Sequence, residues 1–220
     1  MKKLKKIVKS KPMAYFLIAI GIIGISISVH LYLHQPRPPK QTSETSVNLN
    51  AAPSSEKLSH TAIANYSVPA NKPRYIAIPA LNISNTPVLK LGLGSSGAIA
   101  TPDNIYETGW YSGSALPGDK GAMFIYGHVS SWKADGIFFN LKKLVPGDKI
   151  VITKGDASTL TYQVVSAKIY PYNRVDMKQV LAPINPQVPG LNLMTCTGQI
   201  IKDTSEFNER LVVFTSLVSS

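Results

Sequence analysis

The chain has 220 residues, a formal net charge of +11 and a single cysteine. One cysteine excludes a framework of internal disulfides, because such a framework needs at least two. The positive charge gives no support to nucleic-acid binding, since residues 74–220 hold 13 Lys and Arg against 10 Asp and Glu, a net charge of only +3.

The N-terminal part combines a basic cluster with an apolar run. Residues 13–33 contain no Asp, Glu, Lys or Arg, and as a helix they would span about 31 Å, close to the hydrocarbon thickness of a bilayer. The run is longer than the core of a signal peptide and lacks a clean small-x-small cleavage site. The lysines before it are Lys2, Lys3, Lys5, Lys6, Lys9 and Lys11. Because basic residues stay on the cytoplasmic side, we predict a cytoplasmic tail over 1–12, an uncleaved transmembrane anchor over 13–33 and an extracellular remainder.

Residues 34–73 differ from the rest of the chain in composition. They hold six prolines and many Ser, Thr, Asn and Gln, with no sustained apolar period. Such a segment cannot bury enough apolar surface to offset the entropy lost on ordering. We predict an extracellular linker that tethers the following domain.

Residues 74–220 have the length of one domain and carry short, β-branched apolar stretches separated by turn signals. The predicted strands are residues 74–81, 86–93, 121–128, 148–155, 159–170, 191–196 and 210–218. Short helices are predicted within 138–144 and 175–183. About seven strands in one domain favour an all-β fold, a closed or nearly closed barrel.

Reactive side chains are scarce in this domain. Residues 74–220 contain one cysteine, Cys196, and one histidine, His128, so a structural zinc site, which needs four ligands, is improbable. A thiol paired with an imidazole can form a nucleophile, and each of the two residues ends a strand candidate and has a flanking glycine. Taken alone, His128 fits a hydrogen-bonded loop histidine better than a catalytic one, and Cys196 fits a small buried hydrophobe better than a nucleophile. Both structural interpretations weaken because each residue is the only one of its kind in the domain.

The motifs around these residues resemble those of the sortases, a family of cysteine transpeptidases. "YGH" closes one strand, "LMTC" closes a later one, and "ERLVVFTS" supplies Arg210 fourteen residues after the cysteine. "IPALNIS", "GWYSGSALPGDKGA", "GHVSS" followed by "GIFFNLKKLVPGD", and "TCTG" resemble class F most closely. The resemblance implies an eight-stranded closed β-barrel with one or two short helices, in which His128, Cys196 and Arg210 converge in a groove.

The resemblance also implies a reaction. A membrane-anchored enzyme of this family cleaves an LPxTG-like sorting signal between Thr and Gly through a thioacyl intermediate. It then transfers the protein to an amine of a peptidoglycan precursor or of another surface protein, such as a pilin. No cofactor is expected. The threonines beside the nucleophile, Thr195 and Thr197, are candidate substrate-binding residues, and the loops 171–190 and 199–209 are expected to set specificity.

Other interpretations remain open at this stage. Arg210 fits a surface ion pair with Glu206 or Glu209 as well as a donor to a developing oxyanion. The whole domain could be a tethered binding module or another envelope cysteine enzyme. An L,D-transpeptidase is disfavoured because its serine-histidine-glycine-cysteine cluster is absent, and a papain-like hydrolase is disfavoured because His128 precedes Cys196 in the chain. The acidic residues Asp103, Glu107, Asp119 and Asp135 lack an EF-hand spacing, so no metal site is predicted.

Overall fold

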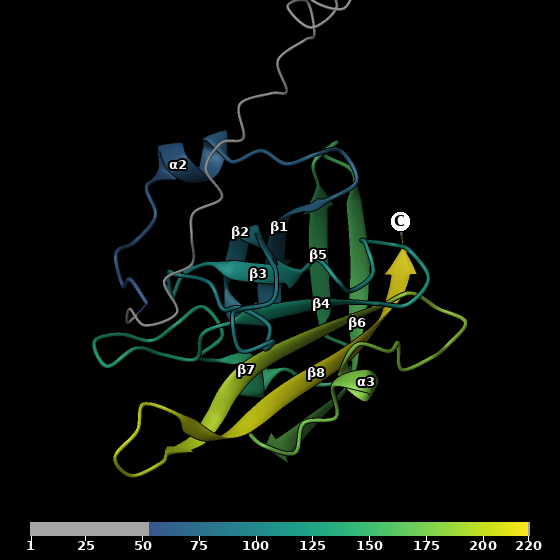
Figure 1. The fold of residues 1–220 in the computed structure, drawn as a ribbon. Coiled ribbons are helices and arrows are strands. Elements are labelled where there is room, and N and C mark those ends of the chain that lie inside the picture. Colours follow the sequence, from purple (N-terminus) through teal and green to yellow (C-terminus); the bar gives the residue numbers. More distant parts are fainter. Residues whose placement is uncertain (1–52, 220) are drawn as a thin grey trace, which may run out of the picture. The chain divides into compact units, whose positions relative to one another are not determined.

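The computed structural model describes residues 53–219, which form a closed β-barrel with the strand order β1-β2-β3-β4-β7-β8-β6-β5 (Figure 1). The elements in chain order are α2 (His60–Asn65), β1 (Pro73–Ile78), η1 (Pro79–Leu81), β2 (Ile83–Leu91), β3 (Thr108–Tyr111), β4 (Ala122–Gly127), η2 (Leu141–Lys143), β5 (Lys149–Lys154), β6 (Thr159–Pro171), α3 (Met177–Val180), β7 (Gly190–Ile200) and β8 (Phe207–Ser219). The pairs β2–β3 and β4–β7 are parallel, and the other neighbours are antiparallel.

Side chains on alternate positions of the strands form two apolar clusters. The larger one draws residues from all eight strands and therefore fills the barrel interior. The smaller one, which we call the outer cluster, consists of Leu91, Phe124, Tyr126, Val180, Val212 and Phe214. Both faces of β4 are buried because one face packs inside the barrel and the other packs into the outer cluster.

The predicted all-β barrel is confirmed, with differences in three elements. The seven predicted strands are present, but β3 was not predicted, because its four residues are interrupted by Gly109 and carry no clear alternation. Strand β7 continues four residues beyond Cys196 to Ile200, so "LMTC" does not close the strand. The two predicted helical segments contain only the short elements η2 and α3.

Residues 53–72 differ from the unstructured linker that their composition predicts. They contain α2, in which the Ser59 side chain caps the first turn by accepting a hydrogen bond from Ala62 N. The segment also contacts the barrel, because the Tyr66 hydroxyl donates to Val88 O over 2.7 Å and Arg74 Nε donates to Tyr66 O over 2.6 Å. These hydrogen bonds to the barrel offset part of the entropy that the segment loses on ordering, and its composition gives no sign of them.

The predicted tail, residues 1–12, and the predicted anchor, residues 13–33, lie outside the described residues, as does the linker up to residue 52. Within residues 53–219, none of the helices has the length and apolar character needed to cross a bilayer.

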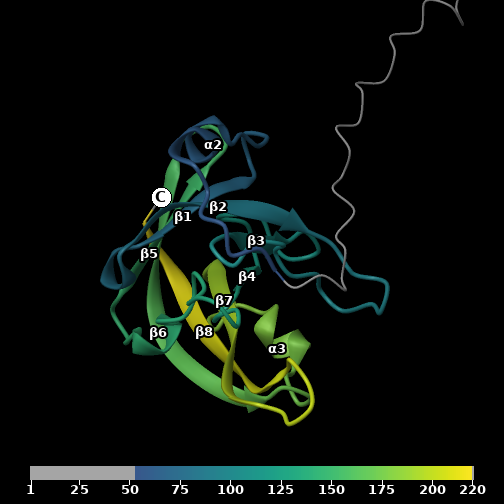
Figure 2. The ribbon, with the colours of Figure 1, turned by 90° about the vertical axis from the view of Figure 1, so that its left-hand side faces the viewer.

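The loop between β6 and β7 is fixed to the barrel by a buried amide. Asn192 on β7 is fully buried, and its Nδ2 donates to Val180 O over 2.7 Å and to Ala182 O over 2.9 Å. These two carbonyls lie at the end of α3, so the bonds hold α3 against the outer side of β7 and β8 (Figure 2). One side chain therefore positions the loop that the sequence assigns to specificity.

We expect Asn192→Ala to lower the free energy of unfolding by about 1–3 kcal/mol, because the buried bond to Val180 O and the partly buried bond to Ala182 O are lost. Asn173→Ala, an exposed asparagine in the same loop, is the control and should change it by less than about 0.5 kcal/mol. Chemical denaturation of both variants measures the difference. Equal stabilities would show that Asn192 does not anchor the loop.

Candidate active site

His128 directly follows β4, and a backbone carbonyl orients its ring. The ring Nε2 lies 2.7 Å from Pro102 O, in the loop between β2 and β3. A carbonyl oxygen only accepts hydrogen bonds, so Nε2 carries the proton that it donates to Pro102. The ring also packs edge-on against Tyr126, with 5.8 Å between the ring centroids. The neutral tautomer therefore leaves Nδ1 as the acceptor nitrogen.

Cys196 lies on β7, the parallel neighbour of β4. The last pair of the β4–β7 ladder is Tyr126 with Met194, and the Tyr126 side chain contacts both reactive residues: its hydroxyl meets the Cys196 sulfur and its ring meets the His128 ring edge-on. The thiol is half-buried at the edge of the outer cluster, and its Sγ lies 3.1 Å from the Tyr126 hydroxyl. Among the described residues, no hydrogen bond joins the Cys196 thiol to the His128 ring; each is bonded to a different partner.

Arg210 faces Cys196 across the antiparallel β7–β8 pair, where the two are direct partners. Its Nη1 donates to Phe207 O over 2.8 Å and to Glu209 O over 3.0 Å. Its Nη2 forms an ion pair with Glu206 over 2.9 Å, with 59% of the Glu206 side chain exposed. The surface ion pair that the sequence offered as an alternative is therefore present, and it coexists with a position beside the thiol.

Burial opposes the charged forms of both reactive groups. It raises the pKa of the Cys196 thiol, while the Tyr126 hydrogen bond and the positive charge of Arg210 act in the opposite direction. Burial also lowers the pKa of His128, although the hydrogen bond to Pro102 and the negative charge of Asp103 partly compensate. At neutral pH the resting site therefore holds mainly a thiol and a neutral imidazole.

The two candidate substrate-binding threonines line a small cavity with Cys196. This cavity of about 150 Å³ is also lined by residues of the segment between β4 and β5 and by residues of β8. The buried Thr195 hydroxyl donates to Gly127 O over 2.8 Å, a bond that ties β7 to the end of β4 just before His128. Thr197 is half-buried on the same wall. Substrate contact by either residue stays a prediction.

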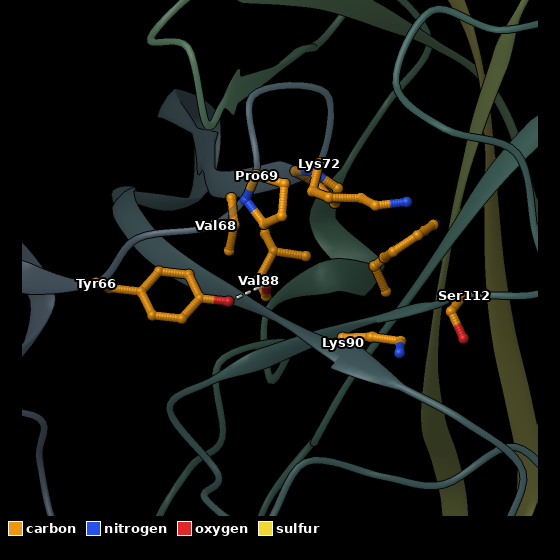
Figure 3. A pocket seen from close by; sticks show the side chains of 9 residues that line it. Tyr66, Val68, Pro69, Lys72, Val88, Lys90 and Ser112 are labelled. Carbon is orange, nitrogen blue, oxygen red and sulfur yellow. Dashed lines mark hydrogen bonds between the residues drawn. The ribbon is translucent and has the colours of Figure 1, made fainter. Parts of the chain in front are cut away.

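A larger cavity of about 500 Å³ lies elsewhere on the barrel (Figure 3). It is formed by residues 66–73 against β2 and β3, with Trp110 in its wall and Lys72 and Lys90 among its lining residues. None of His128, Cys196 and Arg210 borders it. The smaller cavity is the candidate active site because Cys196 lines it, although His128 and Arg210 are not among its lining residues.

The acidic residues considered for a metal do not gather into a ligand set. Within residues 53–219, no group of three or more His, Cys, Asp or Glu side chains could hold a metal ion. The pKa of Glu107 is raised, mainly by burial and to a lesser extent by the negative charge of Asp103.

Sequence reasoning missed two partners of the reactive pair. Tyr126 precedes His128 by two residues on a strand, so period-two alternation places both on one face, and this signal was available in "YGH". The contact of Pro102 with His128 had no such signal, because it joins a loop carbonyl to a residue 26 positions away.

Comparisons with known proteins agree with this fold. The family model described as a sortase domain matches residues 76–218. Similar solved structures include sortase C1 of Streptococcus suis, with 22% identity, a TM-score of 0.52 and coverage of 69% of this chain and 75% of that one. A lid mutant of sortase A of Corynebacterium diphtheriae has 24% identity, a TM-score of 0.52 and coverage of 80% and 88%, respectively. Sortase C of Streptococcus pneumoniae has 24% identity, a TM-score of 0.52 and coverage of 76% of each chain.

At these identities the likeness to solved structures establishes the fold, and the family model establishes the family. A search of curated protein sequences found no match. The domain match covers the barrel strands that carry His128, Cys196 and Arg210. The chain therefore belongs to the sortase family of cysteine transpeptidases.

Proposed function

We propose that this sortase cleaves an LPxTG-like sorting signal between Thr and Gly and transfers the acyl part to an amine of the cell envelope or of another surface protein. The observation that carries this proposal is that Cys196 and Arg210 are direct partners across β7 and β8, while His128 follows β4, the parallel neighbour of β7. Membership in the family argues against a binding module without catalysis and against the papain-like and L,D-transpeptidase alternatives.

In the first half-reaction, the Cys196 thiolate attacks the carbonyl carbon of the substrate threonine. A C–S bond forms and the carbonyl π electrons move to oxygen, giving a tetrahedral oxyanion. When the carbonyl reforms, the C–N bond breaks and Nδ1 of protonated His128 gives its proton to the departing glycine nitrogen. The hydrogen bond from Nε2 to Pro102 keeps Nδ1 in this role.

In the second half-reaction, an acceptor amine attacks the thioester carbon and gives a proton to His128 Nδ1. The new C–N bond forms as the C–S bond breaks, which returns the thiolate and the imidazolium to their starting states. Arg210 supplies donors beside the sulfur; its planar guanidinium suits a developing oxyanion or the substrate backbone.

The location and the class belong to the same proposal. The lysine cluster and the apolar run of residues 13–33 support a single membrane anchor with a cytoplasmic N-terminus and an extracellular barrel. The motifs "GHVSS" and "TCTG" support class F, although the similar solved structures named above belong to classes A and C. Sorting-signal proteins and an envelope amine are the expected partners.

The central test follows cleavage by the full-length protein in detergent. We expect a fluorescent LPxTG peptide to form a thioacyl adduct on Cys196, visible by intact mass, and to be transferred to added triglycine. Cys196→Ala should abolish both adduct and transfer, because no other thiol exists in the chain. Turnover retained by that variant would refute the mechanism.

The second prediction concerns pH. The active form needs a thiolate and an imidazolium, but burial moves the pKa of Cys196 above 9.0 and that of His128 below 6.5. We expect a bell-shaped kcat/KM profile whose acid limb lies below pH 6.5 and whose alkaline limb lies above pH 9.0. The thiolate–imidazolium pair is then a minority species, so turnover is slow. A flat profile from about pH 5 to 10 would contradict this assignment.

The third prediction separates catalysis by Arg210 from its ion pair with Glu206. Lysine keeps the charge but not the planar fork, so we expect Arg210→Lys to lose about 10²- to 10³-fold in kcat/KM. The thermal midpoint should change little, because an exposed ion pair contributes about 0–1 kcal/mol. Arg174→Lys, an exposed arginine of the same domain, is the control. A near wild-type rate in Arg210→Lys would remove Arg210 from the mechanism.

A further inference from the structure

The Tyr126 phenol is placed to act on the nucleophile. Its oxygen lies 3.1 Å from Cys196 Sγ, and only 7% of its surface is exposed. The ring is held on one side by the outer cluster and on another by the edge-on His128 ring. A tyrosine fixed in this way presents its hydroxyl to the sulfur in a defined geometry.

The direction of this hydrogen bond depends on the charge of the sulfur. A thiol can donate weakly to the phenol oxygen, whereas a thiolate can only accept, so the phenol O–H then becomes the donor. Burial, followed by the nearby Cys196, raises the pKa of Tyr126 well above its ordinary value. The phenol therefore keeps its proton at every pH at which the enzyme works, which excludes a role for Tyr126 as a base.

We propose that Tyr126 is a further catalytic residue, whose hydroxyl donates a hydrogen bond to the Cys196 thiolate and increases the fraction of the nucleophile in that form. The proposal rests on the proposed function, because it takes Cys196 as the nucleophile. Hydrogen bonds to charged acceptors are stronger than those to neutral ones, so the bond favours the thiolate over the thiol and the thioester. It acts when the thiolate forms and again when it leaves the acyl group.

The other charged and titratable groups around the sulfur do not replace this donor. Arg210 on β8 favours the thiolate, but its Nη1 and Nη2 already donate to two carbonyls and to Glu206. Glu206 disfavours the thiolate by its negative charge. His128 makes its hydrogen bond to Pro102. Within residues 53–219, Tyr126 supplies the side-chain hydrogen bond to the thiol.

Alkylation of the sole cysteine tests the proposal without any substrate. The rate of reaction of the full-length protein with iodoacetamide, followed by intact mass from pH 6 to about 11, reports the thiolate fraction of Cys196. We expect Tyr126→Phe to move the midpoint upward by about one pKa unit, the effect of losing one hydrogen bond to a charged group. The limiting rate at high pH should be equal or higher, because a more basic thiolate is a better nucleophile.

The transpeptidation rate supplies the second readout. In Tyr126→Phe the thiolate fraction should fall about tenfold, and the greater nucleophilicity of the remaining thiolate should offset part of this loss. We therefore expect kcat/KM on the plateau to fall about threefold. The alkaline limb of the pH profile should move upward together with the alkylation midpoint. Tyr170→Phe is the matched control, because this tyrosine loses a hydrogen bond to Gln179 without touching the thiol. Its midpoint should equal that of the wild type.

Replacement of Tyr126 by 3-fluorotyrosine keeps the hydroxyl but makes it a stronger donor, so the midpoint should move downward. This arm decides the question if Tyr126→Phe does not fold, which its thermal midpoint reveals. An unchanged midpoint in the fluorinated protein, or in a folded Tyr126→Phe, overturns the proposal. A shifted midpoint in an enzyme that cleaves no sorting peptide would instead refute the proposed function and leave the Tyr126–Cys196 interaction standing.

Discussion

The parallel pairing of β4 with β7 is the constraint on which the site depends. It fixes the register of Tyr126 against Met194 and so places the Tyr126 hydroxyl at the Cys196 sulfur, two residues further along β7. Both faces of β4 are buried, so a slip by one residue would exchange the barrel interior with the outer cluster. The core packing and the catalytic alignment are therefore set by the same hydrogen-bond ladder.

This placement has a chemical cost. Strands buried on both faces give precise positions, but they take the thiol and the imidazole partly out of water and disfavour the ionised pair that attacks the substrate. The protein offsets the cost with fixed dipoles and donors: the Pro102 carbonyl at His128 and the Tyr126 hydroxyl at Cys196. These groups are in place before the substrate binds, so the site needs little reorganisation during the reaction.

Much of this arrangement could be predicted from the sequence, and the exceptions have physical causes. The barrel followed from alternating β-branched stretches, and Cys196 and His128 stood out because each occurs once in the domain. Strand β3 escaped because four residues are too few to show a period. The ordered structure of residues 53–72 depends on packing against the distant β2, and the orientation of His128 depends on the backbone carbonyl of Pro102. No local sequence pattern encodes either contact.

The ion pair of Arg210 with Glu206 is compatible with the proposed catalytic role of Arg210. In the resting structure, the guanidinium is occupied by two backbone carbonyls and by Glu206. The carboxylate partner is mostly exposed, so exchanging that ion pair for a substrate oxyanion costs about 0–1 kcal/mol, whereas a preorganised donor to the oxyanion lowers the activation free energy by about 3–4 kcal/mol. In the proposed mechanism the gain at the oxyanion exceeds the loss of the ion pair, so the exchange would be favourable. Glu206 would then hold Arg210 near Cys196 until a substrate oxygen takes its place.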